Sequence, residues 1–182
     1  MIKWFNLWFF YAVGYLIAII VQEWANKKRG APFDDPEFLF QGKKQIFILG
    51  MTWLLSGFVI SLFVEVNYGV LFYIGLVFYL IGMIVGIITL YEFANNSGLV
   101  TQGIHQFSRN PIYVGWLIFY FGLTLMGFSF SIASILFMVY FIITFPYFHW
   151  TILLEEEFLS RKYGENYIEY LKNSPRYLKL RK

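Results

Sequence analysis

The chain alternates between long apolar runs and shorter polar segments. Four runs contain no Lys, Arg, Asp or Glu, and they cover residues 4–21, 46–64, 68–91 and 111–154. As one helix the last run would be about 66 Å long, at about 1.5 Å per residue, whereas the hydrocarbon core of a bilayer is about 30 Å thick. We therefore predict that it folds back at "GFS", residues 127–129. This gives five transmembrane helices, the last two in a tight hairpin.

The pattern predicts an all-α integral membrane protein. Open strands leave backbone groups unpaired in lipid, and a barrel would need short alternating segments instead of long, solidly apolar ones. The first run is expected to be retained as a helix, because the "VQEWANKKRG" that follows it is bulky and charged and offers no small-residue cleavage site. The whole chain, residues 1–182, is expected to form a single membrane domain.

Short helices are expected in the cytoplasmic C-terminal tail. A helical period of apolar residues continues beyond residue 154, and Gly164 should interrupt it. The segment "ENYIEYLKN" then predicts a short helix that Pro175 ends. In the first polar loop, "GAPFDDPEF" contains two prolines and predicts an irregular segment.

Composition agrees with a membrane protein and excludes several chemistries. The chain is 59% hydrophobic and 14% charged, whereas a soluble domain is about half apolar and about a quarter charged. It has no cysteine, which excludes disulfides and cysteine-based metal or nucleophile chemistry. The net charge of +3 is too small to indicate nucleic-acid binding. The two histidines and the acidic residues have no metal-ligand spacing, so no metal site is predicted.

The basic residues predict the orientation. Of the 14 Lys and Arg, only Lys3 precedes the first run. With five spans, all the others fall on one side, which the positive-inside rule makes cytoplasmic. The N-terminus is then outside and the C-terminus in the cytoplasm, at the inner membrane if the source is bacterial. Because the outer connections are short, we expect the chemistry of the protein on the cytoplasmic face.

A polar stretch, "GIHQFSRNPIYVGW" at residues 103–116, stands at the mouth of the last apolar run. Pro111 suits the first turn of a helix, so Arg109 and Asn110 lie at a helix N-terminus, which carries a partial positive charge. Backbone N–H groups at such an end bind anions, and a carboxylate would bind well here. The hairpin returns the acidic residues 155–157 to the same face.

These two stretches together resemble the isoprenylcysteine carboxyl methyltransferase and phosphatidylethanolamine N-methyltransferase superfamily of integral membrane methyltransferases. Before the hairpin, the pattern of that family is met by Gly103, Ile104, Arg109, Asn110, Pro111, Tyr113 and Gly115. After it, the pattern is met by Glu155, Glu156, Leu159, Gly164, Tyr167, Tyr170 and Arg176. The chain departs at His105, where the family usually has Tyr, at Tyr163, where it has Phe, and at Glu157, which makes the acidic pair a triplet. Asn110 replaces a His that is common in one branch.

The resemblance implies S-adenosyl-L-methionine as cofactor and a lipophilic small molecule or lipid as acceptor, methylated on a carboxylate, an amine or a thiol. Arg109 and Glu156 are implied as catalytic residues. Cofactor binding is implied for Gln102, Gly103, Ile104, His105, Arg109, Asn110, Pro111, Tyr113, Glu155 and Glu156. Residues 91–182 would hold the cofactor, and three helices in residues 1–90 would form the acceptor side.

The three glutamates cannot all face one pocket, because successive residues of a helix point about 100° apart. Glu157 is expected to face away, unless the acidic pair is 156–157. Two other functions remain open: a sterol-reductase-like membrane reductase that uses NADPH, and a non-catalytic membrane protein or small transporter. Against a transporter, no predicted span carries a charge in its interior. The oligomeric state is not determined by the sequence.

Overall fold

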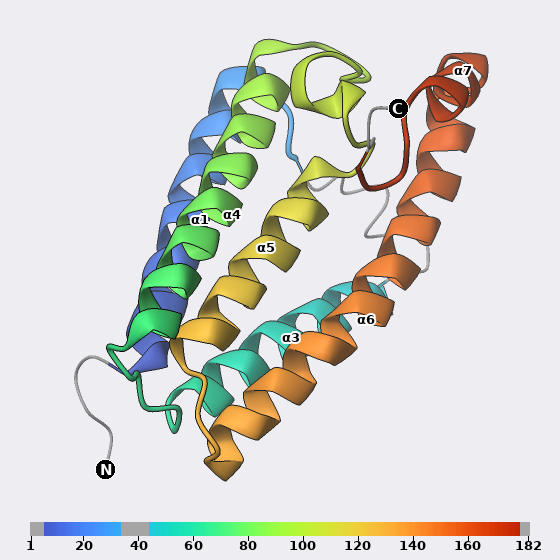
Figure 1. The fold of residues 1–182 in the computed structure, drawn as a ribbon. Coiled ribbons are helices and arrows are strands. Elements are labelled where there is room, and N and C mark those ends of the chain that lie inside the picture. The colour runs from blue at the N-terminus through green and yellow to red at the C-terminus, as the bar shows by residue number, and fades with distance from the viewer. Residues whose placement is uncertain (1–5, 34–43, 179–182) are drawn as a thin grey trace.

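The computed structural model describes residues 6–33 and 44–178, and within these ranges all the secondary-structure elements are helices (Figure 1). The elements in chain order are α1 (Leu7–Arg29), α3 (Lys44–Ser61), α4 (Val70–Asn95), the short 3-10 helix η1 (Gly103–Gln106), α5 (Pro111–Met126), α6 (Ile132–Tyr163) and α7 (Glu165–Asn173). The all-α prediction is therefore confirmed. Most of the predicted irregular segment, residues 34–38, lies outside the described residues, as do Lys3, Lys43, Lys179, Arg181 and Lys182.

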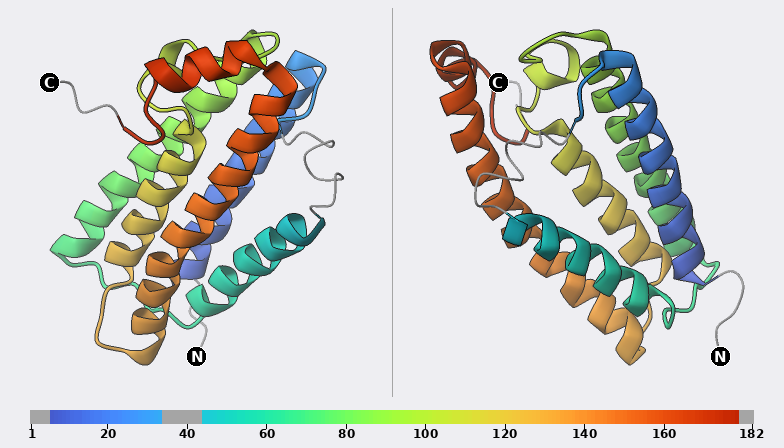
Figure 2. Two further views of the ribbon diagram at one scale, coloured as in Figure 1. Left: turned by 90° about the vertical axis from the view of Figure 1, so that its right-hand side faces the viewer. Right: turned by 180° about the vertical axis from the view of Figure 1, so that it is seen from behind.

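Each of the five predicted spans corresponds to a helix. Among the described residues, α1, α4 and α6 are long and apolar enough to cross a membrane, while α3 (apolar over Ile48–Ser61) and α5 are apolar but shorter. At about 1.5 Å per residue, the 16 residues of α5 make a helix of about 24 Å. One end of the molecule holds the C-terminal ends of α1, α4 and α6 together with the N-terminal end of α5, and α7 also lies there (Figures 1 and 2).

The predicted hairpin is confirmed at the turn after Met126. Gly127 ends α5, and Ser131 caps α6 by accepting a hydrogen bond from the backbone N–H of Ser134 at 3.2 Å. The Ser134 hydroxyl in turn donates to the Gly127 carbonyl at 2.8 Å. Serine is a favoured N-cap because its oxygen satisfies one of the unpaired N–H groups of the first turn. The long apolar run therefore reverses where the sequence supplies a glycine and then serines.

The predicted break in the tail is also confirmed. Helix α6 continues beyond the apolar run to Tyr163, and Gly164 then adopts a φ of 55°, which costs glycine little because it has no Cβ. Helix α7 follows and ends at Asn173, two residues before Pro175. The bend lets α7 fold back over the end of the bundle toward the loop that precedes α5 (Figure 2).

Helices α4 and α5 form the most extensive helix pair of the bundle. A Cβ added to Gly122 would lie 2.4 Å from the backbone nitrogen of Tyr79, and one added to Gly82 would lie 2.5 Å from that of Phe119. Small residues at such contacts allow the backbones of membrane helices to approach closely. This close packing places the N-terminus of α5 against the end of α4.

A pair of alanine substitutions tests this contact. Gly122→Ala should lower the thermal stability of the purified protein, with a cost of about 1 to 2 kcal/mol for overpacking, because its Cβ meets backbone that cannot rotate away. Gly86→Ala is the matched control, because its nearest neighbour is the flexible Ile112 Cδ1 at 3.8 Å. It should be neutral or stabilising, since alanine is the better helix former. Equal losses in the two variants would contradict the packing argument.

Candidate active site

The loop before α5 is held against the C-terminal tail by backbone and hydroxyl contacts. The backbone N–H of Arg109 donates to the carbonyl of Pro175 at 2.8 Å. The Ser108 hydroxyl donates to the carbonyl of Arg176 at 3.2 Å and accepts from the backbone N–H of Asn110 at 3.1 Å. Asn110 and Pro111 then occupy the N-cap and the first turn of α5. Two segments far apart in sequence thus form one rigid edge of the site.

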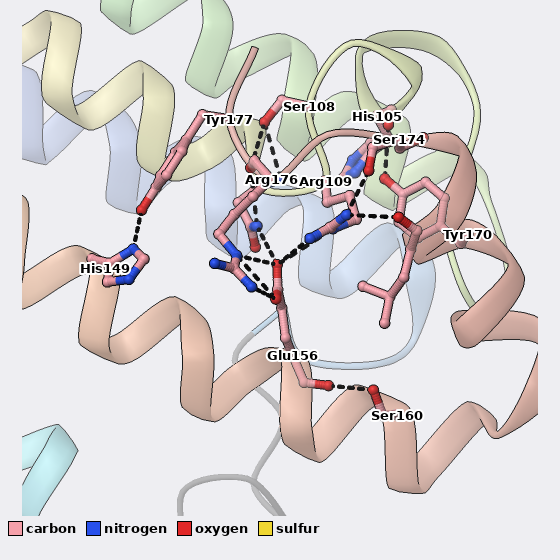
Figure 3. A network of polar contacts seen from close by, with 12 residues as sticks. His105, Ser108, Arg109, His149, Glu156, Ser160, Tyr170, Ser174, Arg176 and Tyr177 are labelled. Atoms are coloured by element: carbon pink, nitrogen blue, oxygen red, sulfur yellow. Dashed lines mark hydrogen bonds and ion pairs between the residues drawn. The ribbon is translucent and has the colours of Figure 1, made fainter. Parts of the chain in front are cut away.

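A buried carboxylate, Glu156, joins the two arginines of this edge (Figure 3). Arg109 donates to Glu156 Oε1 through Nε at 3.3 Å and Nη2 at 3.1 Å. Arg176 donates to Oε2 through Nη2 at 2.8 Å and contacts both oxygens through Nε at 3.1 Å. The Asn110 amide adds a further donor to Oε1 at 3.2 Å. Paired, hydrogen-bonded charges of this kind are the form in which a carboxylate tolerates burial.

Most of the N–H donors of the Arg109 side chain bind other groups of the protein. Besides Glu156, its Nη1 donates to the carbonyls of Leu171 at 2.9 Å and Ser174 at 2.6 Å, at the end of α7. A guanidinium has five N–H donors in a fixed plane, so the described contacts use all but one of them. The side chain of Arg109 therefore holds α7 and the tail in place as well as lining the cavity described next.

A cavity of about 1070 Å³ opens beside this cluster. It lies between the C-terminal ends of α1 and α4, the first half of α3, the start of α5, the C-terminal part of α6, and α7. Its lining includes six of the predicted site residues: His105, Arg109, Asn110, Pro111, Tyr113 and Glu155. The cavity is thus bordered by a helix N-terminus, a cation and a carboxylate, which is a donor and acceptor set for a zwitterionic ligand.

The three consecutive glutamates have three different surroundings. Glu155 lines the cavity and accepts from the Tyr113 hydroxyl at 3.0 Å. Glu156 is buried in the arginine cluster, with 9% of its side chain exposed. The side chain of Glu157 is 61% exposed and contacts Arg161 at 3.8 Å on the outer face of α6. This arrangement is the one expected for the acidic pair at 155–156, with Glu157 facing away.

His105 contributes a half-buried side chain to the wall of the cavity. Its Nε2 is buried and has no hydrogen-bond partner among the described residues, and its carbonyl accepts from the Tyr170 hydroxyl at 2.7 Å. Burial raises the pKa of Tyr170 to about 12, so this hydroxyl stays protonated and donates. Burial lowers the pKa of His105 to about 4, which keeps the imidazole neutral near pH 7.

The low pKa of His105 predicts an acid-dependent loss of stability. The folded value of about 4 lies below the ordinary value of about 6.5. Between these values the unfolded chain binds a proton that the folded protein does not, so stability falls as the pH falls through this window, by at most about 1.4 kcal/mol per pH unit. His105→Phe should reduce this slope in thermal unfolding measured from pH 4 to pH 7. If stability depended on pH with the same slope in His105→Phe and in the unmodified protein, a buried, neutral imidazole would be contradicted.

Four predicted site residues do not line the cavity: Glu156 on α6, and Gln102, Gly103 and Ile104 in the loop before α5. Gln102 is exposed and occupies the N-cap position of η1 without a side-chain cap hydrogen bond. Gly103 has a φ of 61°, and a Cβ added to it would lie 1.8 Å from Glu92 Oε1. The backbone N–H of Ile104 donates to the carboxylate of Glu92, at 2.9 Å and 3.1 Å to its two oxygens. In the structure these loop residues shape η1, which carries His105.

Sequence reasoning missed three contributors to the site. Glu92, at the C-terminal end of α4, holds η1 through the N–H of Ile104. Lys28 and Arg29, taken as topology signals, line the cavity. Arg29 also donates to the carbonyls of Phe93 at 3.0 Å and Gly98 at 2.6 Å. The contact of Glu92 with the N–H of Ile104 could not be predicted, because a glycine (Gly103) some residues after an acidic helix end is too weak a sequence signal.

The second histidine, His149, contacts the C-terminal tail. Its Nδ1 lies 2.6 Å from the hydroxyl of Tyr177, which ties the tail to α6 (Figure 3). This contact lies on the opposite side of Glu156 from the cavity residues shown in the figure. Neither His149 nor Tyr177 lines the cavity. The contact is therefore a second attachment of the tail and not part of the candidate site.

Fold and site together define an all-α membrane protein with a cavity, lined by apolar, polar and charged residues, at the end of the helical hairpin where α5 begins. The family model for phospholipid methyltransferases matches residues 69–166, and the chain belongs to this family. The matched region contains η1, the hairpin and the three glutamates, and it ends before α7 is complete. The resemblance noted from the sequence is thereby confirmed.

One similar protein is "Protein-S-isoprenylcysteine O-methyltransferase B" of Arabidopsis thaliana. It is 35% identical over 77 residues, which are 42% of this chain and 37% of that protein. The chain thus aligns with little more than a third of the length of this relative. No solved structure matches the chain.

Proposed function

We propose that the protein is an S-adenosyl-L-methionine-dependent methyltransferase that acts on a lipophilic acceptor. The observation that carries the proposal is the cavity in which Arg109, the N-terminus of α5 and Glu155 stand together. The membership of the chain in the phospholipid methyltransferase family supports the same class of reaction. So does the name of its relative, which is an O-methyltransferase.

The donor set of the cavity suits this cofactor. A carboxylate would bind at the start of α5, where the first backbone N–H groups have no partner within the helix and Arg109 adds positive charge. An ammonium or ribose hydroxyls would bind Glu155, whose carboxylate accepts hydrogen bonds. The neutral His105 ring, with its buried Nε2, would meet an uncharged polar group. When bound, the cofactor supplies an activated methyl group.

The residues of the chain would act by positioning rather than by acid–base chemistry. Methyl transfer needs the nucleophile of the acceptor aligned with the methyl group, and such alignment accounts for a large share of the barrier lowering in bound reactants. Glu156 would serve the reaction through Arg109, which it orients, and not by touching the cofactor. Its position among Arg109, Arg176 and Asn110 supports this role (Figure 3). The apolar helices around the cavity would exclude water and admit a lipophilic acceptor.

The charge distribution supports a site that opens to the cytoplasm. Lys28, Arg29 and Lys162 lie at the same end of the bundle as the cavity and line it. Under the positive-inside rule this end is cytoplasmic, where a water-soluble cofactor is available. Lipid could reach the same cavity from the side, since the walls are membrane-spanning helices.

The proposal is tested with the purified chain in lipid nanodiscs. We expect methyl-labelled S-adenosyl-L-methionine to bind, and to label a component of a total lipid extract that can then be identified by mass. NADPH is the control ligand, because a reductase of the alternative class would bind it and ignore the methyl donor. Binding of NADPH with no binding of S-adenosyl-L-methionine would overturn the proposal.

A further inference from the structure

A second cavity of about 330 Å³ adjoins the first, deeper in the bundle. The two share the lining residues Phe33, Gly50, Leu54, Ile112 and Tyr113, so they are direct neighbours. All five apolar helices, α1, α3, α4, α5 and α6, contribute to the walls of this second cavity, which we call the aromatic chamber. Its size is near the low end of the range for small-molecule sites, about 300 to 1000 Å³.

The chamber is lined by aromatic rings and carries no charge. No Lys, Arg, Asp, Glu or His is found among the described residues that line it. Six of its rings are Tyr15, Trp53, Trp116, Phe119, Tyr120 and Tyr147. Two of the walls are stacked ring pairs, Tyr15 with Trp116 at 4.7 Å and Trp53 with Tyr147 at 5.2 Å between centroids. An anionic group would be strongly disfavoured here, because no cationic side chain lines the chamber to compensate its desolvation.

One side of the chamber is bordered by a cluster of tyrosine hydroxyls. The Tyr120 hydroxyl is its centre and contacts those of Tyr15, of Tyr11 at 3.4 Å and of Tyr140 at 3.2 Å. Tyr11 also donates to the carbonyl of Leu54 at 2.9 Å, and Tyr140 to that of Trp53 at 3.2 Å. Tyr15 and Tyr120 belong to the lining of the chamber, whereas Tyr11 and Tyr140 stand behind them.

The number of hydroxyl protons limits what this cluster can still bind. Each tyrosine hydroxyl has one proton to donate and also accepts hydrogen bonds. The four hydroxyls have four protons for the five contacts just named, so one contact has no proton of its own. With Tyr11 and Tyr140 donating to backbone carbonyls, the protons of Tyr15 and Tyr120 can both be used between the hydroxyls. Lone pairs then stay open while every proton has an acceptor, and this arrangement favours a ligand that supplies a hydrogen-bond donor.

We propose that the aromatic chamber binds an uncharged ring of the methyl acceptor, with a hydroxyl or N–H donor of that ring bonded to the Tyr15–Tyr120 hydroxyls. This inference rests on the proposed function, because the ring is assigned to the acceptor through the adjacency of the two cavities. The reacting end of the acceptor then faces the larger cavity, past Ile112 and Tyr113. A ring suits the chamber better than a saturated chain, because aromatic faces and edges favour ring partners in defined orientations. An unsubstituted alkyl chain would also leave the hydroxyl cluster without a hydrogen-bond donor.

Three radiolabelled probes test the chamber directly, by equilibrium dialysis against the protein in nanodiscs with empty nanodiscs as the blank. They are 2-naphthol, which has a ring and a donor, naphthalene, which has the ring alone, and 1-decanol, which has a donor on a chain. We expect 2-naphthol to bind at least tenfold more tightly than either of the others. Similar affinity for 1-decanol and 2-naphthol would overturn the proposal, whatever the variants show.

The hydroxyl cluster is tested by removing one oxygen while keeping the ring. Tyr120→Phe should reduce the preference for 2-naphthol over naphthalene at least fivefold, and Tyr15→Phe serves if that variant does not fold. Tyr79→Phe is the matched control, because its hydroxyl donates to the Phe10 carbonyl at 3.0 Å and does not line the chamber. An equal loss in Tyr79→Phe, or no loss at either chamber tyrosine, would overturn the assignment.

Binding of S-adenosyl-L-methionine is measured in the same nanodiscs without any probe. If 2-naphthol binds as expected but the methyl donor does not, the proposed function fails while the chamber remains a ring-binding site. If the methyl donor binds and labels an acceptor but the ring preference is absent, the chamber assignment alone fails. The two failures are therefore distinguishable.

Discussion

Replacing Glu156 by Gln is expected to destabilise the protein by about 3 kcal/mol, and to weaken the binding of S-adenosyl-L-methionine as well. Breaking a buried ion pair costs about 3 to 5 kcal/mol, because the partner charge stays buried without compensation. The lower figure applies here, since the Arg176 side chain is 34% exposed and water can solvate it, whereas Arg109 is only 10% exposed. Gln keeps the size of the side chain, so the loss reports on charge and not on packing.

The measurement is thermal unfolding of the purified variant in detergent, together with calorimetry of cofactor binding. Glu157→Gln is the matched control, because it is the adjacent residue of the same helix and the same substitution. Its side chain is 61% exposed and its contact with Arg161 is long, at 3.8 Å, and exposed pairs of this kind contribute little. Glu157→Gln should therefore change neither the unfolding temperature nor the affinity for the cofactor. A Glu157→Gln variant that is the more damaged of the two would refute the assignment of the acidic pair to 155–156.

Replacing Glu155 by Gln should impair the cofactor site and leave the fold intact. Hydrogen bonds to charged groups contribute about 1.5 to 3 kcal/mol, and about 1.4 kcal/mol corresponds to a tenfold change in affinity. We therefore expect S-adenosyl-L-methionine to bind about 10- to 100-fold more weakly, with an unfolding temperature close to that of the unmodified protein. The difference from Glu156 follows from position, since Glu155 lines the cavity and Glu156 does not.

Calorimetry of cofactor binding and thermal unfolding on the same preparation provide both readouts. Tyr113→Phe is a useful companion variant, because it removes the 3.0 Å hydrogen bond to Glu155 while leaving the carboxylate in place. It should weaken binding less than Glu155→Gln does. Unchanged affinity in a folded Glu155→Gln variant would show that the carboxylate does not contact the cofactor.

Helix positions and ends were largely predictable from the sequence, because they depend on local properties. The long charge-free runs predicted the spans, the last of them was too long for one span and required a reversal, and Gly127 with Ser131 supplied the turn. Gly164 and Pro175 placed the break and the end of the tail helix. The two motifs around the hairpin indicated the family, and the same stretches supplied Arg109, Asn110 and Glu155 as candidates, all of which line the cavity.

What remained undetermined was how each helix is rotated about its own axis. Because neighbouring residues point about 100° apart, a single rotation decides whether Glu155 or Glu156 faces the cavity, and nothing in "EEE" specifies it. The rotation is determined by packing, and it placed Glu156 between arginines 47 residues earlier and 20 residues later in the chain.

The same reason applies to the deeper parts of the site. The contact of Glu92 with the N–H of Ile104, the close approach of α4 and α5 at Gly82 and Gly122, and the meeting of four tyrosine hydroxyls from α1, α5 and α6 all join residues on separate elements. Apolar helices of nearly uniform composition carry little signal for which faces meet. The sequence by itself thus determined the membrane helices, their breaks and the motifs at their ends. Only the tertiary structure decided which side chains meet, because that depends on the steric fit between helices.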